Sequence, residues 1–156
     1  MSKELARQYY SKFELDPDLF ADKNNYQPYV YTQEKSDATV KRYREMGRVF
    51  LAVMLGDEPI GEVILKSIDP EKKHCTLGIS MQSDAYKNKG YGTVAEIQAL
   101  EYAFYEMEME TVFADSLKNN KRSQHVLMKV GFQETHRDDT FIYYQCDRRN
   151  WKKSQL

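Results

Sequence analysis

The first stretch of the chain has the spacing of an amphipathic helix. Between Lys3 and Phe13, the apolar residues Leu5, Tyr9 and Phe13 recur every four positions. Residues four apart lie on one face of an α-helix, so this spacing predicts a helix over 3–13. Its apolar face needs another layer of the protein to pack against.

A loop and a second helix are expected next. Pro17 and Pro28 punctuate the polar stretch that follows, which is typical of a loop. Thr32 is a suitable N-cap residue, and Gly47 is a suitable residue to end a helix. We therefore expect a second helix from Thr32 through about Met46.

The hydrophobic period then changes to that of strands. The runs 48–55, 59–68 and 75–81 are apolar and rich in β-branched residues, and turn chemistry at Gly56-Asp57 joins the first two. A polar turn over 69–74 precedes the third run. Because the connections are short, the three strands are predicted to form an antiparallel meander.

The second half of the chain alternates helix and strand. A helix is expected to start near Gly92 or Thr93, with an apolar stripe that packs it on a sheet. The stripe consists of Ile97, Leu100, Phe104 and Met107. We predict a strand at 111–117, a helix at 122–130 and a closing hairpin whose two strands are 132–137 and 140–147. This order indicates an α+β domain with a mixed sheet, not a doubly wound parallel fold.

Length and charge narrow the classes of function. The 156 residues suffice for one domain, 1–156, and the net charge is −1, with 23 basic and 24 acidic residues. We therefore expect no nucleic-acid or membrane partner, because no bulk field attracts either one. Cys75 and Cys146 lack metal-ligand spacing. Free thiols and the absence of a signal peptide at the start indicate a cytoplasmic protein without a metal site.

The residues before the third helix are suited to bind an anion. Gly90 and Gly92 have no side chain to block approach, and Lys87 and Lys89 add positive charge. The first amides of a helix have no partner within it and carry the positive end of its dipole. Such a turn is a ready site for a pyrophosphate. The alternative at this point is a plain glycine-rich turn before a surface helix.

Two blocks of sequence resemble the GCN5-related N-acetyltransferase (GNAT) superfamily. The first, 77–96, carries a form of the Q/R-x-x-G-x-G/A signature, with lysine at its first position, Lys87. The second, 120–132, is similar to the N-x-x-S-x-x-x-L-x-K-x-G-F pattern of ribosomal-protein amino-terminal acetyltransferases. The resemblance covers roughly residue 48 to the end and implies a mostly antiparallel sheet with helices on both faces and splayed central strands. The family's usual first strand is either missing or lies before a truncated start.

The resemblance also implies acetyl-CoA as the cosubstrate. The pantetheine arm would pair with backbone of the third meander strand, and the pyrophosphate would bind amides at the start of the helix. The residues concerned are Ile79, Ser80, Met81, Gln82, Lys87, Asn88, Lys89, Gly90, Tyr91, Gly92 and Thr93. Asn120 and Ser123 match positions near the CoA and thioester end.

Acetyl transfer to an amine requires a route for the amine proton and stabilisation of the departing thiolate. Asp115 and Glu62 are candidate bases. The alternative for Asp115 is a carboxylate that caps loop amides at the end of a strand, and the alternative for Glu62 is an exposed strand residue. Ser123 is the candidate acid, because many family members carry a tyrosine where this chain has Leu127. The alternative for Ser123 is a hydroxyl in the first turn of a helix.

The sequence therefore predicts an N-acetyltransferase that moves an acetyl group to a primary amine by direct attack in a ternary complex. The alternative is a non-catalytic CoA-binding regulatory module with the same fold. A protein amino terminus, a polyamine, an aminoglycoside and an amino-acid-like metabolite all stay open as acceptors, and a homodimer stays open as the assembly. The segment 16–31 and the second helix are expected to wall the acceptor side.

Overall fold

The computed structural model describes residues 1–17 and 20–152. Within them, six strands form one mixed sheet in the order β1-β2-β3-β4-β6-β5, and only β3 and β4 run parallel. The strands are β1 Val49–Leu55, β2 Glu58–Asp69, β3 His74–Met81, β4 Thr111–Leu117, β5 Gln133–Arg137 and β6 Phe141–Asp147. The α-helices are α1 Lys3–Ser11, α2 Gln33–Glu45, α3 Tyr91–Glu101 and α4 Lys121–Val130.

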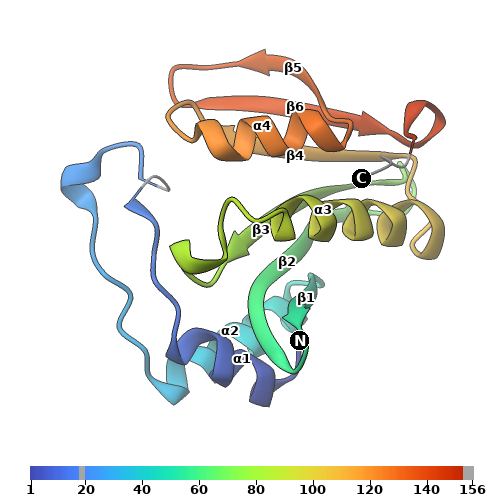
Figure 1. Cartoon of the computed structure of the whole chain (residues 1–156). Helices are drawn as coiled ribbons and strands as arrows, with labels where there is room; N and C mark the ends of the chain where they lie inside the picture. The colour runs from blue at the N-terminus through green and yellow to red at the C-terminus, as the bar shows by residue number, and fades with distance from the viewer. Residues whose placement is uncertain (18–19, 153–156) are drawn as a thin grey trace.

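Helices cover both faces of the sheet. α1 and α2 pack on β1 and β2, whereas α3 and α4 lie over β3 and β4 (Figure 1). Side chains alternate between the two faces along a strand, and β2 shows this directly. Val63 and Leu65 enter the main core with α3, whereas Ile64 packs against the smaller core with α1 and α2. The predicted α+β class is therefore confirmed.

The two central strands separate along their length. β3 and β4 pair only over His74–Thr76 and Thr111–Phe113. Beyond this short ladder, β3 stays paired with β2 as far as Met81, and β4 stays paired with β6 as far as Leu117. Each strand is thus held by its outer neighbour, and a gap opens between them, as the family resemblance implied.

Most predicted elements agree with the structure to within one or two residues. Thr32 caps α2 by accepting a hydrogen bond from the Lys35 amide. The first helix is shorter than predicted and ends at Ser11, because Lys12 adopts a non-helical conformation. Phe13 lies just beyond the helix and its ring packs edge-on against Tyr29.

The helix after the glycines also differs in detail from its prediction. α3 begins at Tyr91, with Gly90 as the N-cap in the left-handed region. It ends in a π-helical turn over Tyr102–Glu106, closed by a 3.0 Å bond from the Met107 amide to the Tyr102 carbonyl. The expected stripe is otherwise confirmed, because Ile97, Leu100 and Phe104 are buried and Met107 packs at the core's edge.

The segment between α1 and α2 lies along one side of the molecule, from the α1–α2 layer to the turn before α4 (Figure 1). It contains a short helical turn at Lys23–Asn25. The Glu14 amide donates to the Gln82 carbonyl at 2.7 Å, and Asn119 Nδ2 donates to the Phe20 carbonyl at 3.5 Å. The segment therefore bonds to both diverging halves of the sheet. Residues 18 and 19 of the expected acceptor wall lie outside the described part.

The expected free thiols are confirmed, because Cys75 on β3 and Cys146 on β6 are both buried and unpaired. Burial raises the pKa of the Cys75 thiol to about 11. Among the described helices, none combines the length and the apolar character that crossing a membrane requires.

Candidate active site

A cavity of about 320 Å³ fills the gap between β3 and β4. Residues from β3, β4, α3, α4 and the segment after α1 line it. Its volume falls within the range of about 300–1,000 Å³ that is common for sites of small ligands. The divergence of the two strands therefore creates an open site in the middle of the sheet.

The β3 side of the cavity offers unpaired backbone. The Gln82 amide donates to the Ile60 carbonyl at 2.8 Å. This bond identifies which pairs of residues between β2 and β3 are hydrogen-bonded and which are not. Hydrogen-bonded and non-hydrogen-bonded pairs alternate along antiparallel strands. Ile79 and Met81 stand at the non-hydrogen-bonded positions, so their N–H and C=O groups point into the gap.

The other two predicted residues, Ser80 on β3 and Gln82 directly after it, have different surroundings. Ser80 lines the cavity, but its carbonyl accepts a 3.2 Å bond from the Tyr9 hydroxyl. Gln82 is buried, and its side-chain amide donates to the Tyr9 carbonyl at 2.9 Å. Its backbone is also engaged, with Ile60 and Glu14. Of the four predicted residues, Ile79 and Met81 are the ones whose backbone faces the gap.

The start of α3 forms one end of the site. Gly90 has φ of 83°, a conformation that other residues adopt with strain. A Cβ atom built on Gly92 would meet no protein atom within 4 Å, so its backbone faces open space beside the cavity. The amides of Tyr91, Gly92 and Thr93 lie in the first turn and have no partner within the helix. These groups are the ones that the sequence predicted as a cradle for a pyrophosphate, and the binding of a phosphate there stays a prediction.

The lysines of the signature differ in their environments. Lys87 lines the cavity and forms ion pairs with Asp16 and, at 2.9 Å, with Asp84. Its charge is therefore already balanced by carboxylates from two segments. Lys89 is exposed, and Asn88 adopts a positive φ of 59° in the turn between them.

Glu62 lies on β2, on the α1 side of the sheet. It stands opposite Ser80 in the β2–β3 ladder, and the Tyr10 hydroxyl donates to its Oε2 at 2.5 Å. Its side chain is buried rather than exposed. Burial raises the pKa of the Glu62 carboxyl to about 7, and the bond from Tyr10 offsets only part of this rise.

The β4 and α4 side contributes the remaining predicted residues. Asp115 is exposed and borders the cavity. Asn120 is the N-cap of α4, and its side-chain oxygen accepts a 3.2 Å bond from the Ser123 amide. Ser123 therefore occupies the first turn, and it lines the cavity together with Leu127, one helical turn later.

Two residues that bear on the site were not predicted from the sequence. Tyr10, which bonds to Glu62, follows Tyr9 of the predicted apolar face. Glu96 lines the cavity on α3 and is only 2% exposed. Its signal was a charged residue inside an apolar stripe, four positions before Leu100 and one before Ile97.

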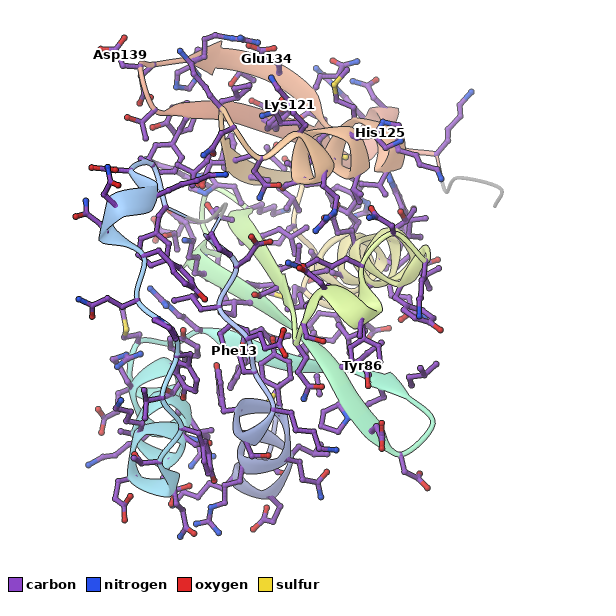
Figure 2. All side chains as sticks on the ribbon, turned by 60° about the vertical axis from the view of Figure 1, so that its left-hand side comes forward. Phe13, Tyr86, Lys121, His125, Glu134 and Asp139 are labelled. Carbon is purple, nitrogen blue, oxygen red and sulfur yellow. The ribbon has the colours of Figure 1, made fainter. Side chains whose placement is uncertain are left out.

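The histidines lie away from this constellation. His125 is on the exposed side of α4, in the opposite half of the molecule from Phe13 (Figure 2). His136 stacks on Tyr143, and His74 packs on Phe113. Over residues 1–17 and 20–152, no group of three or more His, Cys, Asp and Glu side chains has a geometry that could hold a metal ion.

Comparisons with known proteins agree on one family. The family model of the acetyltransferase (GNAT) domain matches residues 2–133. A curated relative, the uncharacterized N-acetyltransferase YnaD of Bacillus subtilis, is 29% identical over 106 residues. That match covers 67% of this chain and 61% of the relative, so the chain spans less than two thirds of the relative's length.

Solved structures share the fold at low sequence identity. A spermidine N-acetyltransferase from Vibrio cholerae is 15% identical with a TM-score of 0.72, over 94% of this chain and 92% of its own. A putative acetyltransferase from T. thermophilus is 20% identical with a TM-score of 0.74, over 97% and 85%. The N-acetyltransferase PseH of Campylobacter jejuni, in complex with acetyl coenzyme A, is 20% identical with a TM-score of 0.65, over 74% and 79%.

The residues at the gap fit a long ligand with a phosphate end. Gly92 leaves open space beside unpartnered amides, backbone of Ile79 and Met81 faces the gap, and the buried Oε2 of Glu96 has no bonding partner. The family match spans most of the chain and includes both the cradle and the α4 block. The chain belongs to the GNAT acetyltransferase family, whose members are acyltransferases that use acetyl-CoA as the cosubstrate.

Proposed function

We propose that this chain is an N-acetyltransferase that moves the acetyl group of acetyl-CoA to a primary amine by direct attack in a ternary complex. One observation carries the proposal: the cavity between the diverging strands runs from Gly92 at the start of α3 to Ser80 on β3, and Ser80 stands opposite the buried Glu62 in the β2–β3 ladder. The cradle suits the phosphates, and the carboxyl suits the amine.

Glu62 is the residue that we assign to the amine proton. An alkylammonium group with a pKa of about 10.4 must lose a proton before its nitrogen can attack a thioester. A carboxyl with a pKa of about 7 is close to the best basicity for proton transfer near neutral pH. The Tyr10 hydroxyl holds this carboxyl in place at 2.5 Å. Glu62 would accept the proton directly or through one water molecule.

The backbone of β3 would stabilise the reacting carbonyl. When the amine nitrogen bonds to the carbonyl carbon, negative charge builds on the oxygen until the C–S bond breaks. The amides of Ile79 and Met81 point into the gap, so either one can donate to that oxygen. They sit on a strand that is paired with β2 throughout, which keeps the donors fixed.

Ser123 is our candidate for the leaving sulfur. Acetyl-CoA supplies the acetyl group as a thioester, and the departing thiolate takes up one proton for each proton that the amine releases. Leu127 cannot donate, whereas the Ser123 hydroxyl lines the same cavity one turn earlier. A thiol of pKa about 8.5 leaves readily, so a single hydroxyl is a sufficient donor.

Asp115 is the second candidate base. Its carboxylate borders the cavity from β4, on the side of the gap opposite to β3. It is exposed, so it is better placed to attract a cationic amine from solvent than to hold a proton in a dry site. We therefore assign the proton relay to Glu62 first and to Asp115 second.

We propose a primary amine as the acceptor and leave the class of amine to the acceptor screen. Glu14 and Asp16 line the cavity from the segment after α1; Asp16 is paired with Lys87, so Glu14 is the carboxylate that we assign to attracting a cationic amine on that side. Polyamines belong in any panel of acceptors because one structural relative is a spermidine N-acetyltransferase. Peptides with free amino termini, aminoglycosides and amino acids complete the panel.

The test is an acceptor screen in which the release of CoA thiol from acetyl-CoA is followed for each amine. We expect one class of amine to raise thiol release well above the rate without acceptor. The buried Cys75 and Cys146 add little background, and a blank with the protein alone corrects for them. Binding of acetyl-CoA with no thiol release across the panel would instead support the non-catalytic CoA-binding module.

A further inference from the structure

We propose that the carboxyl group of Glu96 bonds to the pantetheine arm of acetyl-CoA and positions the cosubstrate in the gap. The inference rests on the proposed binding of acetyl-CoA in this cavity. It assigns a cosubstrate-positioning role to a residue that lies outside the glycine signature and the α4 block.

Glu96 lies where the two strands begin to diverge. It is on α3, four residues after Gly92, and it lines the cavity while being 2% exposed. Several other residues that line the same cavity, among them Leu77, Ala114 and Leu127, are buried and apolar. None of these side chains can donate or accept a hydrogen bond, so they leave the carboxyl without a partner.

No hydrogen bond or ion pair within the described part of the chain explains why a carboxyl group stands at position 96. Glu96 Oε2 is buried and makes no hydrogen bond, and within the described chain Glu96 forms no ion pair. Burying an unsatisfied polar group is costly, and an apolar residue at this place in the stripe would pack without that cost. A group kept in such a place points to a partner that arrives from outside.

Burial also determines which form of the carboxyl is present. It raises the pKa of Glu96 to about 8, so the group is mostly neutral at pH 7. A neutral carboxyl has one O–H donor and retained acceptor capacity, whereas an ionised one only accepts. The neutral group can therefore donate to a carbonyl oxygen.

The pantetheine arm offers matching acceptors at the right depth. Successive turns of an α-helix are about 5.4 Å apart, so Glu96 lies about one turn deeper along α3 than Gly92. With the phosphates at Gly92, the arm that connects them to the thioester enters the gap beside Glu96. The arm contains two amide groups, and each has a carbonyl that the Glu96 O–H can reach as a donor.

The same geometry predicts that affinity depends on pH. An ionised Glu96 would lose its donor and would place a negative charge near the phosphates of the ligand. Acetyl-CoA binding should therefore weaken above about pH 8. The other ionisable groups that face the cavity are carried by the segment after α1, β2, the turn before α3, β4 and α4. They are Glu14, Asp16, Lys66, Lys87, Asp115 and Arg122.

Three forms of the protein separate Glu96 from these groups. Glu96→Gln keeps a donor and an acceptor but cannot ionise, and Glu96→Leu removes both. Gln98→Leu makes a similar change at an exposed position of the same helix. Calorimetric titration with acetyl-CoA gives the affinity, and thermal unfolding without ligand gives the stability.

We expect Glu96→Leu to bind acetyl-CoA about three- to tenfold more weakly at pH 7, the size of one lost neutral hydrogen bond. The wild-type affinity should fall by about tenfold between pH 7 and pH 9, and Glu96→Gln should remove this dependence. Glu96→Leu should raise the melting temperature of the ligand-free protein, because an unsatisfied group leaves the core. Gln98→Leu should leave affinity unchanged.

Two results would overturn the inference. One is wild-type affinity in Glu96→Leu at both pH values. The other is a loss of ligand-free stability in both Glu96 variants, which would make the carboxyl a structural group. If the wild-type protein itself binds no acetyl-CoA, the proposed function fails, and the inference about Glu96 fails with it.

Discussion

Replacing Gly92 with valine should separate cosubstrate binding from folding. The Cβ position of Gly92 has no protein atom within 4 Å, and its backbone has no left-handed conformation to lose. Valine also has a slightly better helix propensity than glycine. We therefore expect the free energy of unfolding to stay within about 0.5 kcal/mol of wild type.

The effect of Gly92→Val on acetyl-CoA binding should be large. The added methyl groups fill the open space through which a phosphate reaches the amides of the first turn of α3. Losing two hydrogen bonds to a charged group, at about 1.5 kcal/mol or more each, costs about 3 kcal/mol. Each 1.4 kcal/mol is about tenfold in affinity, so the dissociation constant should rise by at least about a hundredfold.

Calorimetric titration with acetyl-CoA and thermal unfolding of the same samples measure both quantities. Gly92→Ala, with its single methyl group, should give an intermediate loss of affinity. Gly90→Ala is the contrasting control: its φ of 83° should make it lose about 1 kcal/mol of stability. Unchanged acetyl-CoA affinity in a folded Gly92→Val protein would refute the assignment of the phosphate cradle.

Three further predictions concern the carboxyls and Ser123. Glu62→Gln should lower turnover about a hundredfold with little change in acetyl-CoA affinity, and it should remove the rise of wild-type activity through about pH 7. Asp115→Asn should lower turnover less. A larger loss of turnover in Asp115→Asn than in Glu62→Gln, measured as a pH–rate profile, would move the base to Asp115. Ser123→Ala should lower turnover about tenfold to a hundredfold, and weak binding with normal turnover would make Ser123 a positioning residue instead. Glu96 retains its proton up to about pH 8 in the folded protein, whereas an ordinary glutamate releases it near 4.5, so the folded state binds more protons and stability falls as pH rises between these values. At pH 7 this loss is on the order of 3 kcal/mol, and urea unfolding at pH 5 and pH 8 should show a steeper fall for wild type than for Glu96→Gln; parallel curves would contradict it.

The elements of the fold could be predicted because their signals are local. Thr32 caps α2 because the Lys35 amide in the first turn has no acceptor within the helix, and the Thr32 hydroxyl accepts its hydrogen bond. The apolar runs 48–55 and 59–68 predicted two strands joined by a turn, and both strands are present as β1 and β2. The π-helical turn at Tyr102–Glu106 had no such signal, because it depends on how the end of α3 meets the core.

The site could be predicted only in part, because its contacts join distant segments. The glycines indicated an anion cradle, but the pairing of Lys87 with Asp16 joins residues 71 positions apart. The bond from Tyr10 to Glu62 spans 52 positions. No local sequence pattern predicts either pair, and the first one balances the charge of a lysine that lines the cavity.

The separation of β3 and β4 shows the same limit. Local patterns predicted both strands, but they did not say that pairing stops at Thr76 and Phe113. The family resemblance supplied that feature. The burial of Glu96 follows from the divergence, since its carboxyl lies in the gap that the two strands leave.

The most direct measurement quantifies both products of one reaction: the CoA thiol released and the acetylated amine formed, with the best acceptor of the screen. We expect equal amounts of the two products from wild type, and a large drop in both with Glu62→Gln while acetyl-CoA still binds. Thiol release without an acetylated amine would show that water is the acceptor. Tight binding of acetyl-CoA with neither product, for every class of amine, would contradict the proposal that this chain is an N-acetyltransferase.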